Sequence, residues 1–196
     1  NRMLDQLNQS IEALTQRVHE NTATDPNRPA AAYSEHRILL PLIPYKVRAT
    51  MSATYSLAGS GASFRLPLDT TTNPGYDQSG GFNATTNQWV VPLTGSYLAT
   101  GKVNFNIGLA SLTYLIALCS IYQNGAPASP GFQVVAGSNG TALIPNTGYD
   151  ALINDTYEFN VGDVIELHAS QQNSAGAAIT VENQQFTYLS LHLFSR

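Results

Sequence analysis

The chain reads YLATGKVNFNI from Tyr97 to Ile107. Every second residue of this run is apolar or glycine, and the residues between them are mostly polar. Side chains of a β-strand point alternately to the two faces of a sheet, so the pattern predicts a strand that lays one face on a hydrophobic core. The same alternation occurs in residues 47–55 and 165–169. Strand periodicity therefore dominates the chain from residue 38 onward.

Turn-forming residues separate these runs, as in Asn73-Pro74-Gly75, Asn124-Gly125 and Val161-Gly162-Asp163. No helical periodicity is visible after residue 38. Many short strands joined by such turns are typical of sandwiches and jelly rolls. We predict an all-β jelly-roll sandwich of about ten antiparallel strands over residues 38–196.

Two of the expected strands are apolar on both faces. The run from Tyr114 to Tyr122 is apolar almost throughout. In residues 186–194, one face carries Phe186, Tyr188 and Phe194, and the other carries Leu189, Leu191 and Leu193. A sandwich strand needs only one apolar face, so we expect another copy of the chain to cover the second face in a closed symmetric assembly. The head residues predicted at this interface are Tyr114, Ile116, Leu189, Leu191 and Leu193.

The first 20 residues follow a different pattern, in which apolar residues recur at alternating spacings of 3 and 4. A narrow apolar seam of this kind predicts a coiled coil, and the alternative is one amphipathic helix lying on the core of the head. Two prolines then interrupt the helix. We predict a coiled-coil stalk over residues 1–20 and a linker over 21–37, followed by the head over 38–196. The stalk residues expected in the seam between copies are Leu4, Leu7, Ile11, Leu14 and Val18.

Composition excludes some classes of partner. The net charge is −4 and no run of Lys or Arg occurs, so the chain lacks the clustered positive charge of a nucleic-acid groove. No stretch approaches the roughly 20 apolar residues that span a bilayer, so no membrane span is expected. Cys119 is the only cysteine and stands in an apolar run, which predicts a buried thiol rather than a disulfide or a nucleophile.

Residues that could carry chemistry are scattered. His19, His36, His168 and His192 show no metal-ligand spacing, and we interpret the last two as ordinary polar strand positions. Four carboxylates lie near turns and could pair as general acid and base: Asp150, Asp155, Glu158 and Asp163. Carboxylates near turns are usually solvated. We therefore predict no enzymatic activity and no cofactor.

Two loops offer candidates for binding. The loop from Asp69 to Asp77 has oxygen donors for calcium, but Pro74 stands where the helix–loop–helix calcium motif needs glycine, so calcium is the weaker hypothesis. The segment 127–145 is long and rich in Gly, Pro and Asn. Recognition often lies on such loops above a rigid scaffold, although the same composition suits a loop without a role. The residues predicted to lie in binding loops are Asn124, Asn139 and Asn146.

Residues 88–97, QWVVPLTGSY, resemble the signature of globular heads of the complement-component-q type: aromatic, two residues, Pro, two residues, Gly, one residue, aromatic. The Asn124-Gly125 hairpin, the run VGDVIEL at 161–167 and the closing run FTYLSLHL at 186–193 follow in the family's order. Tyr188 replaces the glycine of the family's last strand. The resemblance extends from about residue 47 to residue 194.

This resemblance implies a ten-stranded jelly roll shared with tumour-necrosis-factor-like ligands. It also implies a tight homotrimer, with the terminal strand and its sheet neighbours at the threefold axis. Members of the family are binding heads rather than enzymes. No collagen-like stalk precedes this head, and the predicted coiled coil and low charge look more like the versions found on bacteriophage particles.

We therefore predict a non-enzymatic, homotrimeric virion surface protein, either a phage fibre tip or a capsid decoration. Its expected partners are other copies of itself, other virion proteins through the N-terminal segment, and a host surface glycan or protein. The alternative is a secreted or cell-surface ligand module of the complement-q type. A hydrolase of surface glycans that uses Asp150 or Asp163 is the third hypothesis.

Overall fold

The computed structural model describes residues 45–72, 75–108, 112–128, 132–137 and 147–195, with residues 132–137 as backbone only. The predicted stalk and linker, with Leu4, Leu7, Ile11, Leu14 and Val18, lie outside the described residues. The loop residues Asn139 and Asn146 also lie outside them. In the part of the chain that is described, no helix is long and apolar enough to cross a membrane.

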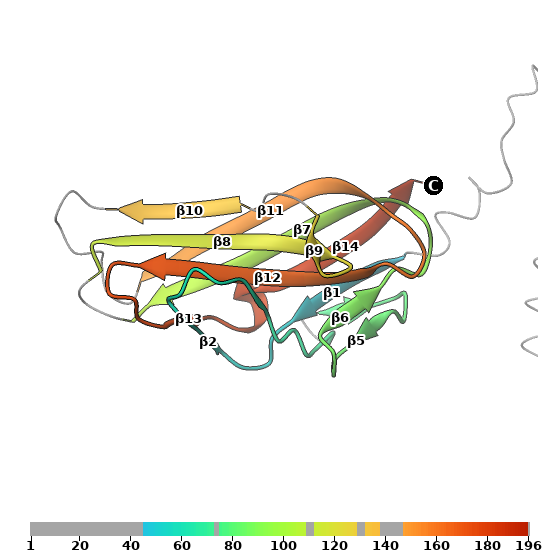
Figure 1. Ribbon diagram of the computed structural model, residues 1–196. Helices are drawn as coiled ribbons and strands as arrows, with labels where there is room; N and C mark the ends of the chain where they lie inside the picture. The colour runs from blue at the N-terminus through green and yellow to red at the C-terminus, as the bar shows by residue number, and fades with distance from the viewer. Residues whose placement is uncertain (1–44, 73–74, 109–111, 129–131, 138–146, 196) are drawn as a thin grey trace, which may run out of the picture. The chain divides into compact units, whose positions relative to one another are not determined.

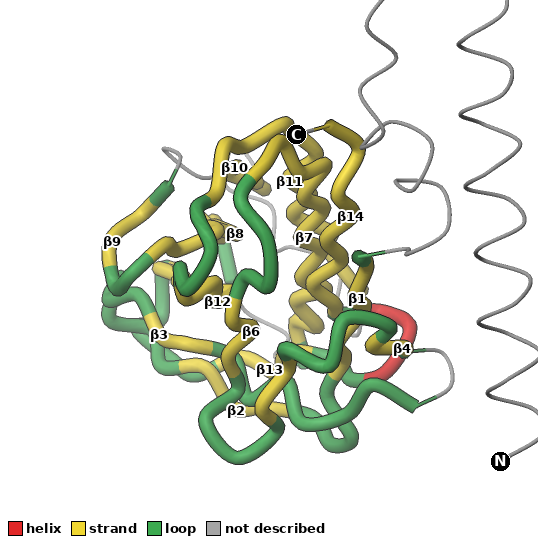
Figure 2. The backbone as a smooth tube through the Cα atoms, turned by 90° about the vertical axis from the view of Figure 1, so that its right-hand side faces the viewer, coloured by secondary structure: helices red, strands yellow, loops and turns green. Residues whose placement is uncertain are grey.

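The described residues form two antiparallel sheets of seven strands each, which face one another as two layers (Figures 1 and 2). Sheet A contains, in hydrogen-bonded order, β11 (Thr147–Phe159), β7 (Gly95–Ile107), β14 (Tyr188–Ser195), β1 (Lys46–Thr50) and β4 (Tyr76–Asp77), while β13 (Ile179–Val181) pairs with β7 and with β2 (Tyr55–Leu57). Sheet B contains β10 (Phe132–Gly137), β8 (Tyr114–Gln123), β12 (Val164–Asn173), β6 (Gln88–Val90) and β5 (Phe82–Asn83), with β9 (Ala126–Pro127) on β8 and β3 (Phe64–Arg65) on β12. A 3-10 turn, η2 (Gln184–Phe186), precedes β14.

The predicted all-β sandwich is confirmed, with more strands than expected because several contain only two or three residues. The run from Tyr97 to Ile107 forms a single strand, as its alternation predicts. The run 47–55 is instead divided between β1 and β2. The Asp69 carboxylate accepts hydrogen bonds from the backbone N–H of Ser52, at 2.7 Å, and from its hydroxyl group. These bonds hold the chain in a bend, so alternation predicted the burial of Met51 but not the end of the strand.

The segment 88–97 organises one end of the core. The rings of Trp89 and Tyr97 are both fully buried and meet edge to face with centroids 5.5 Å apart. Gly95 lies where β7 approaches β14 closely, and a Cβ atom there would come within 2.7 Å of Leu193 Cδ1. Any larger residue would therefore force the two strands apart.

The leucines of β14 lie inside the protomer. Leu189, Leu191 and Leu193 are 2%, 0% and 8% exposed and face sheet B. The chain's own second sheet covers them, so their assignment to an interface between copies is corrected. The physical reason is simple: a two-layer sandwich needs one apolar face on each strand, and these leucines provide it.

The strand β8 is also buried on one face only. Its inward residues, Leu115, Ala117, Cys119 and Ile121, are fully buried. Burial raises the pKa of Cys119 to about 12, as expected of an inert structural thiol. Tyr114 and Ile116 point to the outer face of sheet B, away from sheet A. They are therefore on the opposite side of the sandwich from β14.

Candidate functional site

The first candidate surface is the outer face of sheet A, called face A below. Directly paired residues of neighbouring strands share a face, so the register of β1, β14, β7 and β11 fixes its membership. By this register, face A contains Lys46, Arg48, Leu98, Thr100, Lys102, Asp150, Leu152, Asn154, Tyr188, Ser190 and His192. Phe194 is exposed at the register shift between Leu193 and Ser195 at the end of β14, and we include it in face A.

Three large apolar side chains of face A are exposed to solvent. Leu98 is 42% exposed, Leu152 is 45% exposed and Phe194 is 58% exposed. They stand on β7, β11 and β14, which are neighbours in sheet A. Leu98 lies near the end of β14 that carries Phe194, whereas Leu152 pairs with Lys102, four residues further along β7. Exposed apolar side chains on one face of a sheet favour contact with another molecule.

Face A is also positively charged along its β1 side. The guanidinium group of Arg48 lies 4.0 Å from the centre of the Tyr188 ring, and Lys46 Nζ lies 5.3 Å from that of Tyr76. Such cation–π contacts hold the two basic side chains against aromatic rings of the same sheet. Further along, Lys102 Nζ pairs with an Asp150 carboxylate oxygen at 3.0 Å.

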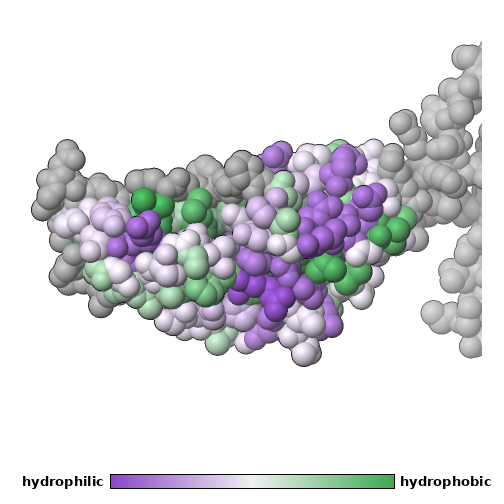
Figure 3. Space-filling view, viewed as in Figure 1, coloured by the Kyte–Doolittle hydropathy of each residue, from purple (hydrophilic) through white to green (hydrophobic). Residues whose placement is uncertain are grey.

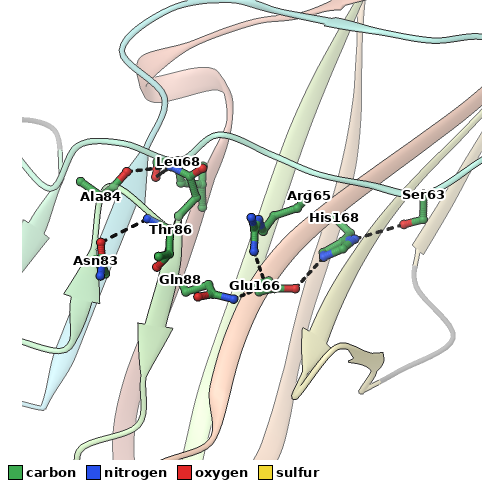
Figure 4. Close-up of polar contacts among 10 residues, drawn as sticks. Ser63, Arg65, Leu68, Asn83, Ala84, Thr86, Gln88, Glu166 and His168 are labelled. Carbon is green, nitrogen blue, oxygen red and sulfur yellow. Dashed lines mark hydrogen bonds and ion pairs between the residues drawn. The ribbon is translucent and has the colours of Figure 1, made fainter.

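The second candidate surface is a polar cluster on the outer face of sheet B, called the Glu166 cluster below (Figure 4). It consists of Ser63, Arg65, Gln88, Tyr122, Glu166 and His168. Glu166 Oε1 accepts hydrogen bonds from Arg65 at 2.8 Å and from Gln88 at 2.6 Å. Its other oxygen lies 2.8 Å from His168 Nε2. Figure 3 shows strongly hydrophilic residues gathered over β12 and β6 on this side of the molecule.

The cluster shifts the ionisation of its two titratable members. Burial alone would raise the pKa of Glu166, but the hydrogen bonds from Gln88, His168 and Arg65 outweigh burial and leave the pKa below its usual range. Burial lowers the pKa of His168, and this effect exceeds the opposing attraction of Glu166. At pH 7 the carboxylate is therefore ionised and the imidazole is neutral.

Sequence reasoning missed this cluster. Glu166 and His168 are two residues apart on one strand, so a shared face was predictable. Arg65 joins them only through the register of β3 on β12, in which it lies opposite His168.

The structure gives Asn124 a role within the fold. Asn124 and Gly125 have φ angles of 53° and 80°, as a tight hairpin turn requires. The Asn124 amide donates to Asp163 at 2.8 Å and accepts from the backbone N–H of Val164 at 2.9 Å. Both ends of the side chain are thus used inside the protomer, and the binding role of exposed Asn124 stays a prediction.

The candidate carboxylates also have partners within the fold. Asp163 accepts from Gln123 and from the backbone of Asn160, while Asp150 is held by Lys102 and Asn104. The two aspartates therefore take part in separate contacts, one at a turn of sheet B and one on face A.

The carboxylates of the loop from Asp69 to Asp77, for which calcium was the weaker hypothesis, also accept hydrogen bonds from within the fold. Both oxygens of Asp69 contact Ser52. Asp77 accepts from the backbone of Ser79, Gly80 and Phe82. Among the residues that the structure describes, no three His, Cys, Asp or Glu side chains gather into a group that could hold a metal ion.

Comparison with known proteins bears on the fold. No family model matches the chain, and no curated protein matches its sequence. Among solved structures, it is similar to that of Eiger TNF from S. frugiperda, with a TM-score of 0.50 and 11% sequence identity. The match covers 78% of this chain and 93% of that chain. At this identity the likeness shows the fold, a jelly roll of the tumour-necrosis-factor type, and it lends no support to a place on a phage particle.

Proposed function

We propose that this chain is an extracellular binding module of the tumour-necrosis-factor and complement-q type, which assembles as a homotrimer through face A. Its main role is to bind rather than to catalyse. The observation that carries the proposal is the exposure of Leu98, Leu152 and Phe194 on one face of a sheet whose inner side is fully packed.

The energetics of face A favour contact with a second copy. Full burial of a Leu or Phe side chain stabilises by about 1.5–3 kcal/mol, and about half of each of the three side chains is still exposed. Burying the remainder would contribute about 2–4 kcal/mol per protomer. In a closed ring every protomer gains this contribution, so a symmetric assembly of copies is favoured as the partner that covers face A.

The comparison supports the proposed extracellular place of action. The structural neighbour is named as a TNF, which is closer to a secreted or cell-surface ligand than to a virion component. The virion role predicted from the sequence rests on the N-terminal heptad pattern and on composition alone. We therefore favour the ligand module, in which three sites held together bind with avidity.

The mass of the full chain in solution tests the assembly. We expect three times the 21.0 kDa of one protomer by light scattering at micromolar concentration. Leu98→Asp places a charge on face A and should give the mass of a single protomer with an unchanged far-ultraviolet circular dichroism spectrum. Val90→Asp is the matched control, because Val90 is also 42% exposed but lies on sheet B.

A wild-type chain with the mass of one protomer would overturn the proposal. So would a Leu98→Asp variant that keeps the wild-type mass, or a Val90→Asp variant that loses it while remaining folded.

A further inference from the structure

Three side chains of the Glu166 cluster form a line of hydrogen bonds (Figure 4). Ser63 Oγ lies 3.4 Å from His168 Nδ1, and His168 Nε2 lies 2.8 Å from Glu166 Oε2. A nucleophile, a base and a group that orients the base occur in this order in enzymes that form a covalent intermediate on serine. The contact between nucleophile and base is often looser before substrate binds.

The direction of these hydrogen bonds follows from the chemistry of the groups. An ionised carboxylate only accepts, so Nε2 of His168 carries the proton and donates it to Glu166. Since the imidazole is neutral, Nδ1 then has a free lone pair. The Ser63 hydroxyl must be the donor in the bond to Nδ1, which is the arrangement that lets a base remove the serine proton.

The base is also held rigidly. The Glu166 side chain is only 8% exposed and is fixed through its other oxygen by Arg65 and Gln88. The His168 ring stacks on the Tyr122 ring with centroids 3.7 Å apart and planes 10° apart. Ser63 itself is exposed, so an electrophile can reach it from solvent.

We propose that Ser63 is a nucleophile for acyl transfer from small activated esters, with His168 as its general base and Glu166 as the positioning residue. This activity lies on the opposite sheet from face A. It goes beyond the proposed binding function and does not depend on it.

The reaction balances within these groups. Ser63 Oγ attacks the carbonyl carbon of the ester while its proton moves to His168 Nδ1, and the Glu166 carboxylate stabilises the imidazolium that forms. The bond from the carbonyl carbon to the leaving oxygen then breaks, and the leaving alcohol takes the proton from His168. Water attacks the acyl-serine, gives a proton to His168 and releases the carboxylic acid. That proton returns to Ser63 Oγ.

The same contacts also tie β3 and β6 to β12, a role that needs no reactivity. A test must therefore measure the reactivity of Ser63 itself. The full chain would be incubated with a fluorophosphonate probe, and the labelled peptide would be identified by mass spectrometry. Hydrolysis of p-nitrophenyl acetate would be followed in parallel.

We expect labelling at Ser63, its loss in Ser63→Ala, and its retention in Ser60→Ala, which replaces a neighbouring exposed serine. His168→Gln should slow labelling by about 10²-fold or more, the usual contribution of a general base. The monomeric Leu98→Asp variant should label like the wild type, which separates this proposal from the trimer.

The pH profile distinguishes a base from a structural contact. The charged groups that face His168 are Glu166 and Arg65, and Tyr122 covers its ring. Because the pKa of His168 lies below its ordinary value of 6.5, the labelling rate should be flat at pH 7–8 and fall only on acidification below that value. Equal labelling rates for the wild type and Ser63→Ala, or no labelled serine in the wild type, would overturn the proposal.

Discussion

The two sheets bury their inner faces in the same way but differ on their outer faces. On sheet A, exposed apolar side chains stand on three neighbouring strands, β7, β11 and β14. On sheet B, Glu166 and its partners satisfy one another within the protomer. Val90 and Tyr114 are exposed there too, but β12 separates their strands. A polar group with partners in its own chain needs no second molecule, whereas exposed apolar side chains gain from being covered.

The largest expected effect is on the free energy of unfolding, and it distinguishes substitutions on the two faces of β14. Leu191 is fully buried, so Leu191→Ala should lower the free energy of unfolding by about 2–5 kcal/mol. Phe194 is 58% exposed on the other face, so Phe194→Ala should change it by about 0.5 kcal/mol or less in an isolated protomer. Urea unfolding in the monomeric Leu98→Asp background gives both values, since assembly would otherwise add to the stability.

In the proposed trimer, Phe194→Ala should instead weaken the assembly, which light scattering on dilution would detect. Equal losses for the two variants in the monomeric background would mean that Phe194 belongs to the core, and the distinction between the two faces would fail.

A smaller loss of stability is expected when either of the two ion pairs on the outer faces of the sheets is removed. The Glu166 side chain is 8% exposed and that of Asp150 is 48% exposed. Glu166→Gln removes the charge that pairs with Arg65 and replaces one of the two acceptor oxygens by an NH2 donor, so it should cost about 1–3 kcal/mol at pH 7. Asp150→Asn removes a solvated pair and should cost about 1 kcal/mol or less. Urea midpoints in the monomeric background measure both changes, and equal costs would show that burial of Glu166 contributes nothing.

Acidification should reduce the difference between Glu166→Gln and the wild type. The pKa of Glu166 is lower in the folded than in the unfolded chain, so its stabilisation is present above the ordinary carboxylate pKa and is lost as pH falls through the folded value. His168 has a lowered pKa as well, so the unfolded chain takes up its proton first below pH 6.5 and stability also falls. Stability curves of the wild type and Glu166→Gln should therefore begin to converge once the pH falls below the ordinary glutamate pKa of about 4.3, and should meet below the lower pKa of the folded chain.

The sequence predicted which side of each strand is buried better than it predicted which part of the molecule, or which other copy, covers that side. Alternation identified the buried side of β7 because burial in a strand has a period of two. The same rule grouped Leu189, Leu191 and Leu193 correctly on one face of β14. It could not say whether a second sheet or a second chain covers them, because both give the same pattern.

Contacts between distant segments were beyond the sequence for a related reason. Arg65 and Glu166 are 101 residues apart and meet only because β3 pairs with β12. No local pattern encodes that pairing, since β3 contains just two residues. The Asn124-Gly125 turn could be predicted, because a turn of this kind needs positive φ at adjacent residues and Asn and Gly tolerate it best.

The smallest expected effect concerns Tyr114, which the sequence assigned to the same interface as β14. Tyr114 is 38% exposed but lies on the outer face of sheet B. Tyr114→Lys should therefore leave the mass in solution unchanged, because the new charge can stay in water while its stem covers the sheet. If this variant instead fell to the mass of one protomer, as expected for Leu98→Asp, copies would have to contact both sides of the sandwich. Face A would then be only half of the interface, and the exposed residues of sheet B would belong to it as well.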